Sequence, residues 1–168
     1  MSRDVIAQLL LSEGGFVDHP NDRGDATNFG ITQATLAWWR KHPVTVEDVR
    51  NLTQAEAAEI LTEQYINAPG FADLNIPDYL RHQIIDYGVN SGPGLVTLKL
   101  QDILHLTPDG DLGPITKAAI EGADPAELNN RLVIARLLML GRLVMRDKSQ
   151  VAFIYGWIDR ACKFFILG

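Results

Sequence analysis

The chain has 168 residues, a length that suits one domain or one domain with a small additional lobe. Hydrophobic residues make up 46% and charged residues 21%, which are ordinary values for a globular protein with a substantial core. The formal net charge of −6 argues against a nucleic-acid-binding protein, because binding to a phosphate backbone requires a basic surface. A local basic run is interpreted as the solvated face of a long helix. It comprises Arg131, Arg136, Arg142, Arg146 and Lys148.

The cysteine content and the apolar segments indicate in which cellular compartment the protein is made. Cys162 is the only cysteine, so no disulfide forms within the chain, and we expect a buried or inert thiol. The apolar run over residues 5–11 is short and follows an acid, so it predicts a folded helix and not a signal peptide. Residues 132–145 are interrupted by two arginines and are too charged for a membrane span. We therefore expect synthesis in the cytoplasm without an export signal.

The N-terminal part of the chain predicts a helix followed by a turn-rich loop. Apolar residues recur at helical spacing over residues 4–13, and Gly14 or Gly15 supplies the left-handed residue that ends this helix. Residues 16–30 show no helical period, and their proline, glycine and short polar side chains predict turns or a short hairpin.

Three threonines further along are candidate helix N-caps. Thr32 precedes a helix that carries two tryptophans, and Thr45 and Thr53 are followed three residues later by Asp48 and Glu56. The second of these pairs begins a helix that reaches about residue 67.

The C-terminal half predicts helices separated by short turns, and the fold class is therefore mainly α, with any sheet confined to residues 16–30. The first expected elements are a helix with Pro77 in its first turn, a turn over 90–94 and a helix over 95–106. A polar loop over 107–113 and a short helix from Pro114 follow. The last two are a long helix, capped by Asp124 and reaching about residue 146, and a final amphipathic helix over 153–165.

Glu13 is a candidate general acid, because it falls in the last turn of the first predicted helix. The negative end of the helix dipole and burial against apolar neighbours both raise the pKa of a carboxyl group there. A raised pKa is what a general acid needs at neutral pH. The alternative is a solvated glutamate beside a glycine C-cap.

The loop after Glu13 supplies a candidate second carboxylate. Glycoside hydrolysis commonly pairs one protonated carboxyl with a carboxylate that activates water or stabilises the cationic transition state. A turn-rich loop of this length can fold Asp22 and Thr27 back to face Glu13, and the Thr27 hydroxyl would then position water. Asp25 competes for the second-carboxylate role, and for either aspartate the alternative is an Asx-turn residue.

Polar and aromatic side chains of a sugar-binding cleft are also predicted. Tyr87 and Asn90 lie three residues apart on one predicted helix and share a face, and Gln101 lies on the next helix. The alternatives are a core tyrosine and helix-surface polar groups. Trp38 and Trp39 point in different directions, so at most one lines a cleft and the other is expected in the core, as is Trp157.

No metal or cofactor is expected. His19 lies among acids but has no second histidine at ligand spacing. Residues 109–113 have a faint resemblance to a calcium loop, but they lack the later glutamate, and a plain turn is favoured.

Several motifs in order resemble glycoside hydrolase family 108, the N-acetylmuramidases found as bacteriophage endolysins and in prophages. The motifs are Glu13-Gly14-Gly15-Phe16, His19-Pro20-Asn21-Asp22-Arg23-Gly24, Thr27-Asn28-Phe29-Gly30-Ile31-Thr32, Asp86-Tyr87-Gly88-Val89-Asn90-Ser91-Gly92, Leu100-Gln101 with Asp109-Gly110-Asp111-Leu112-Gly113-Pro114-Ile115-Thr116, and Phe153-Ile154-Tyr155-Gly156-Trp157-Ile158-Asp159-Arg160. The second half is similar to the peptidoglycan-binding region that accompanies this family, so the resemblance covers nearly the whole chain.

The resemblance implies a lysozyme-like fold with a catalytic lobe over residues 1–92 and a peptidoglycan-binding lobe over 93–168. It implies cleavage of the β-1,4 bond between N-acetylmuramic acid and N-acetylglucosamine, with Glu13 as the catalytic acid. The order Glu13, Asp22, Thr27 also resembles the triad of the better-known phage lysozymes. Asp25 departs from the pattern, because the family more often has glycine there.

The expected biological role is that of a monomeric phage endolysin. Such a protein accumulates in the host cytoplasm and reaches the wall through the lesion that a holin makes. Two other activities stay open: a lytic transglycosylase that uses Glu13 as its sole acid and base, and a non-catalytic module that binds the wall.

Overall fold

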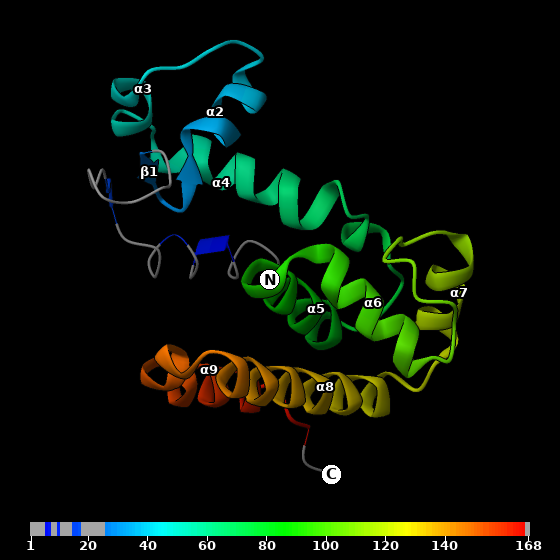
Figure 1. Cartoon of the computed structure of the whole chain (residues 1–168). Helices are drawn as coiled ribbons and strands as arrows, with labels where there is room; N and C mark the ends of the chain where they lie inside the picture. The colour runs from blue at the N-terminus through cyan, green and yellow to red at the C-terminus, as the bar shows by residue number, and fades with distance from the viewer. Residues whose placement is uncertain (1–5, 8–9, 11–14, 18–25, 167–168) are drawn as a thin grey trace. The chain divides into compact units, whose positions relative to one another are not determined.

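The computed structural model describes residues 6–7, 10, 15–17 and 26–166. Within these residues the fold is mainly α with one small two-stranded sheet, which confirms the predicted fold class (Figure 1). The chain divides into two compact units, Met1–Asn67 and Ala68–Gly168. Each unit is described by itself.

A short hairpin lies at the start of the first unit, as predicted. Strands β1 (Thr27–Asn28) and β2 (Ile31–Thr32) pair antiparallel, and Val17 forms an isolated bridge with Thr27. The turn residues Phe29 and Gly30 have φ angles of 52° and 75°. Two positive φ angles in a two-residue loop are typical of a type I′ turn, whose twist matches that of paired strands.

Three threonines cap three helices of the first unit, which confirms the predicted caps. The helices are α2 (Gln33–Arg40) behind Thr32, α3 (Val46–Arg50) behind Thr45 and α4 (Gln54–Thr62) behind Thr53. Each hydroxyl accepts a hydrogen bond from the backbone N–H three residues later, at 3.1–3.2 Å. The carboxylate of Asp48 in turn accepts a hydrogen bond from the N–H of Thr45 at 2.7 Å, which completes a capping box.

A bidentate ion pair joins α2 to α4. Nε and Nη2 of Arg40 donate to the two carboxylate oxygens of Glu56 at 2.9 and 2.8 Å. These hydrogen bonds lower the pKa of the Glu56 carboxyl. The helix α4 continues into a π-helical turn, η1 (Glu63–Asn67). The core beneath these elements contains Ile31, Leu36, Val49, Leu52, Ala57, Ile60, Leu61 and Ile66.

The second unit is entirely helical in its described part. Its elements are η2 (Phe71–Asp73), α5 (Asp78–Ser91), α6 (Pro93–Ile103), α7 (Pro114–Gly122), α8 (Pro125–Arg146), η3 (Lys148–Gln150) and α9 (Val151–Cys162). Helix α8 packs against α5 and α6, and α9 packs beside α8 (Figure 1). None of the described helices is both long and apolar enough to cross a membrane.

The helix boundaries of this unit agree only in part with those predicted from the sequence. Asp124 caps α8 by accepting from the N–H of Glu127 at 2.7 Å, as predicted. The predicted turn over 90–94 is wrong, because α5 continues to Ser91 and α6 begins at Pro93. Proline suits the first position of a helix, and Gly92, with a φ of 89°, is the single residue between them.

The burial predicted for four side chains is also wrong, in whole or in part. Arg136 was expected on a solvated face but is only 3% exposed, because it pairs with a buried carboxylate. Cys162 is exposed. Of the two neighbouring tryptophans, one was expected at a cleft and the other in the core. Trp39 lines a cavity, but Trp38 is 61% exposed and therefore not in the core. Trp157 is only half-buried.

Candidate functional site

The predicted acids of the site lie outside the described residues. This holds for Glu13, for Asp22 and for its competitor Asp25. Their described neighbours are Leu10 and Gly15 around the first acid, and Val17 and Ala26 around the loop that carries the two aspartates.

Thr27 is the one proposed catalytic residue whose position is described. Its N–H donates to the carbonyl of Val17 at 2.9 Å, and the N–H of Val17 donates to its carbonyl at 2.8 Å. On its other side it pairs with Thr32 across the hairpin. Two neighbouring segments therefore hold the backbone of Thr27, and the bridge to Val17 joins the two ends of the segment over residues 18–26.

A buried asparagine fixes this hairpin to α3. Asn28 is 4% exposed, and its amide donates to the carbonyls of Val49 and Arg50 at 3.0 and 3.1 Å. These carbonyls lie at the C-terminal end of α3, where helix carbonyls lack intrahelical partners. The guanidinium of Arg50 also stacks on the ring of Phe16 at 4.5 Å. Sequence reasoning assigned Asn28 no role, although a polar residue in a strand of a hairpin motif is a signal for one.

The first unit contains a cavity of about 590 Å³. Helical residues from the N-terminal segment form one wall, and α2, α4 and η1 form the others. Its lining residues are Ile6, Ala7, Leu10, Trp39, Ala58, Glu59, Thr62, Glu63 and Asn67. An indole, two carboxylates and an amide on an otherwise apolar surface are groups that a glycan-binding cleft uses.

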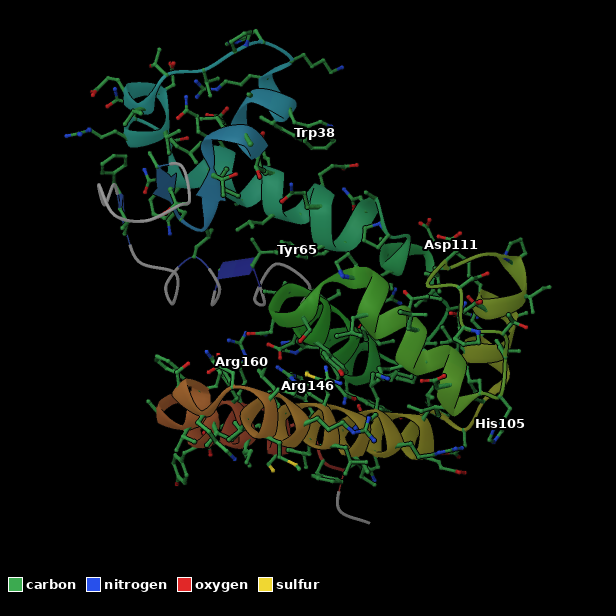
Figure 2. All side chains as sticks on the ribbon, viewed as in Figure 1. Trp38, Tyr65, His105, Asp111, Arg146 and Arg160 are labelled. Carbon is green, nitrogen blue, oxygen red and sulfur yellow. The ribbon has the colours of Figure 1, made fainter. Side chains whose placement is uncertain are left out.

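In the second unit, Gln101 is buried and organises the loop between α6 and α7. Its Nε2 donates to Asp109 Oδ1, to the carbonyl of Asp111 and to Thr116 Oγ1 at 2.7, 3.1 and 3.0 Å. Its Oε1 accepts from the N–H groups of Asp109 and Gly110 at 3.0 and 2.9 Å. Asp111 lies in the loop beside α7 (Figure 2). The side chain is only 1% exposed, so this geometry favours a structural role over contact with a glycan.

The pKa of Asp109 is lowered, first by the hydrogen bond from the N–H of Asp111 and then by the one from Gln101. The bond from Asp111 is 2.9 Å long and closes an Asx turn. This carboxylate is therefore used to hold the loop.

Tyr87 is fully buried in α5, which favours the alternative of a core tyrosine. Burial raises the pKa of its hydroxyl, and the charge of Arg136 opposes that effect. The guanidinium of Arg136 lies 5.2 Å from the ring centroid. A hydroxyl beneath a packed arginine does not face a glycan.

An ion cluster in this unit was missed by sequence reasoning. Asp86 accepts from Arg136 of α8 at 2.8 Å and from Nε and Nη2 of Arg160 of α9 at 2.9 and 2.6 Å. The side chains of Asp86 and Arg136 are 4% and 3% exposed, whereas that of Arg160 is 30% exposed. An aspartate inside an apolar helix is a signal of such a cluster, but its partners lie 50 and 74 residues away.

Asn90 is the predicted binding residue that lies at the surface. Its amide donates to the carbonyl of Asp86 at 2.6 Å, one turn earlier. It lines a cavity of about 180 Å³ together with Ser91, Arg136, Met139, Leu140, Leu143 and Trp157. The structure therefore separates the three predicted binding residues: it buries Tyr87 and Gln101 and leaves Asn90 at a cavity.

Two family matches cover most of the chain. Residues 6–92 match the family described as Glycosyl hydrolase 108, and residues 97–162 match the family described as Predicted Peptidoglycan domain. The solved structure of Brucella abortus SagA is similar, with 32% sequence identity and a TM-score of 0.73, and the match covers 97% of this chain and 94% of that chain. No curated protein matches the chain.

A helical fold with a small hairpin, together with these matches, defines a glycoside hydrolase that acts on peptidoglycan. The first match covers more than half of the chain, so the chain belongs to the Glycosyl hydrolase 108 family. The family resemblance predicted from the sequence is thereby confirmed.

The family matches and the packing divide the chain at different points. The first match ends at residue 92, whereas the first compact unit ends at Asn67. Helix α5 therefore lies in the sequence of the glycoside hydrolase match but packs on α6 and α8 in the second unit. The division into functional lobes over 1–92 and 93–168 stays a prediction.

Proposed function

We propose that this protein is an N-acetylmuramidase that hydrolyses the β-1,4 bond between N-acetylmuramic acid and N-acetylglucosamine. Glu13 is the general acid, Asp22 is the second carboxylate and Thr27 positions the water. The observation that supports this proposal is the family match over residues 6–92, a segment that contains all three residues.

Described residues earlier in the N-terminal segment support this role. Ile6 and Leu10 are helical and line the cavity of about 590 Å³. Glu13 follows Leu10 by three residues in the sequence. The proposed role requires a raised pKa, which an apolar environment gives to a carboxyl group.

The proposed reaction needs only side chains and water. Glu13 donates its proton to the glycosidic oxygen, the bond breaks, and positive charge develops on the sugar ring. Water that Thr27 holds then adds to the anomeric carbon of the sugar. Its proton goes to Asp22, or to the Glu13 carboxylate where Asp22 instead stabilises the positive charge. A separation of about 5 Å between the two carboxyl groups would give retention, and one of roughly 6.5–9.5 Å would give inversion.

Mass spectrometry of the muropeptides released from purified peptidoglycan tests the reaction. Hydrolysis leaves a reducing N-acetylmuramic acid, and a lytic transglycosylase leaves an anhydro sugar that is lighter by one water. We expect reducing ends from the wild type and a severe loss of activity in Asp22→Ala. Anhydro products with a mild effect of Asp22→Ala would instead assign a transglycosylase in which Glu13 acts alone.

The proposed biological role is that of an endolysin. The joint presence of a glycoside hydrolase match and a peptidoglycan domain match supports action on the wall. The protein would act as a monomer, accumulate in the host cytoplasm and reach the wall after a holin opens the membrane. A protein that sediments with peptidoglycan without lowering its turbidity would be a wall-binding module instead.

A further inference from the structure

We propose that the cavity lined by Arg136 and Trp157 is a subsite for a carboxylate on the peptide stem of peptidoglycan. The proposal rests on peptidoglycan as the substrate, and it assigns the recognition of a peptide to residues other than those proposed to cleave the glycan. The lining residues that the structure describes belong to the second unit, at the end of α5, in α8 and in α9.

Among the described residues, the side chains beneath this cavity carry more positive than negative charge. One carboxylate, that of Asp86, serves two guanidinium groups, and both of its oxygens are used. Arg160 donates to Oδ1 from both Nε and Nη2, whereas Arg136 donates to Oδ2 through Nη1. Two positive charges thus share one negative charge, and this excess of positive charge in a partly buried place favours a second anion.

Among residues 26–166, the neighbouring acids do not supply that anion. The described residues that line the cavity include no aspartate or glutamate. Asp159 of α9 pairs with Lys163 at 2.7 Å, and Asp147 accepts from the hydroxyl of Ser149 at 2.6 Å. The cavity thus has a cationic side chain on its wall, and the acids of the adjoining segments have other partners.

The guanidinium of Arg136 is held in place before any ligand binds. Asp86 fixes one end of it, and the Tyr87 ring lies 5.2 Å away. Arginine carries five N–H donors in a planar group that matches a carboxylate. Because burial already fixes this side chain, binding an anion costs little further rotamer entropy.

The remaining walls suit an amino acid and not a bare ion. Asn90 and Ser91 supply polar groups at one side, and the indole of Trp157 lies with three aliphatic side chains. These side chains are Met139, Leu140 and Leu143. A volume of about 180 Å³ corresponds to roughly six water molecules, enough for a carboxylate with a small aliphatic side chain. Peptide stems combine such carboxylates with alanine methyl groups.

Titration followed by two-dimensional NMR of the whole protein tests the proposal. The probe is N-acetylmuramyl-L-alanyl-D-isoglutamine, which has one carboxylate and no glycosidic bond to cleave. The same compound with its carboxylate converted to an amide, and inorganic phosphate, are the comparison probes. The signals to follow are the indole N–H of Trp157 and the Nε–H of Arg136.

We expect the carboxylate probe to shift both signals and the amide to bind at least tenfold more weakly. Arg136→Gln removes the charge, and Leu143→Phe fills the cavity without changing any charge, and both should weaken binding at least tenfold. Arg142→Gln is the control, because this exposed arginine on the same helix does not line the cavity.

Equal binding of the carboxylate and amide probes would overturn the proposal, as would undiminished binding by a folded Leu143→Phe variant. Binding of phosphate without binding of the peptide would also overturn it. If Arg136→Gln does not fold, Leu143→Phe decides the question. Since the probe contains no bond to hydrolyse, failure here leaves the muramidase assignment untouched, and failure of that assignment leaves this result standing.

Discussion

The carboxylate of Asp86 on α5 accepts a hydrogen bond of 2.8 Å from Arg136 on α8, and both side chains are almost completely buried. This pair joins a helix of the glycoside hydrolase match to a helix of the peptidoglycan domain match. The two sequence families are therefore tied together inside one compact unit.

Removal of Asp86 should strongly destabilise that unit. Asp86→Ala leaves two guanidinium groups without their shared carboxylate, and breaking a buried pair costs about 3–5 kcal/mol. Urea unfolding followed by circular dichroism measures the loss. Asp78→Ala is the control, because its carboxylate is exposed and lies 3.9 Å from Arg81. A loss for Asp86→Ala as small as that of the control would contradict the role given to the cluster.

Replacing Gln101 by an apolar residue should lower the free energy of unfolding. Gln101→Leu keeps the volume but leaves the N–H groups of Asp109 and Gly110 and the hydroxyl of Thr116 without this partner. Buried polar groups left unsatisfied cost about 1–3 kcal/mol each, so we expect a loss of roughly 2–4 kcal/mol in urea unfolding.

The control for Gln101 is Asp102→Ala, on the same helix. Its carboxylate is exposed and pairs with Lys99 at 3.3 Å, so the loss should stay below about 1 kcal/mol. An equal loss in the two variants would show that the loop does not depend on Gln101.

Local signals explain which parts of the fold could be predicted. The caps at Thr32, Thr45, Thr53 and Asp124 depend on residues three positions apart, and all four are confirmed. Such a bond is encoded within one helical turn, so the sequence alone contains what is needed to recognise it.

Long-range partners explain what could not be predicted. Arg136 has the spacing of a surface residue in a basic run, and its partner lies 50 residues earlier. Tyr87 was predicted in a cleft because it shares a helix face with Asn90, and Gln101 because it is a polar residue on the next helix. Helical periodicity does not show whether such a face is covered. Only the packing of α5, α6 and α8 decides that they are buried.

Asn28 should couple the stability of the hairpin to activity. Asn28→Ala removes the hydrogen bonds to the carbonyls of Val49 and Arg50, which should cost about 1–2 kcal/mol. The same strand, β1, carries Thr27, so the turnover of peptidoglycan should fall as well. Thermal unfolding and turbidity assays measure the two effects.

Asn51→Ala is the matched control for Asn28. This asparagine is exposed, and its amide donates to Glu47 at 3.0 Å. Wild-type stability and activity are expected for the control. Full activity in Asn28→Ala would show that the hairpin keeps its position without the anchor on α3.

The loop held by Gln101 should weaken in acid. The pKa of Asp109 is lowered by hydrogen bonds from the N–H of Asp111 and from Gln101. A carboxyl whose pKa falls on folding contributes stability above its unfolded pKa of about 3.9, and this contribution is lost as the pH falls through the folded value. Asp109→Asn should therefore be less stable than the wild type at pH 5–7, and the difference should shrink below about pH 4. A difference that grows in acid would contradict this sign.

The central proposal is that Glu13 is the general acid of a muramidase. Glu13→Gln keeps the size and hydrogen-bonding groups of the side chain but removes the proton that the leaving oxygen needs. The most direct test is product analysis of purified peptidoglycan incubated with the wild type and with Glu13→Gln side by side, with circular dichroism to show that both are folded. We predict muropeptides with reducing N-acetylmuramic acid ends from the wild type and a loss of product of at least 1,000-fold in the variant, the upper part of the range for general acid catalysis. Wild-type amounts of the same products from folded Glu13→Gln would contradict the account.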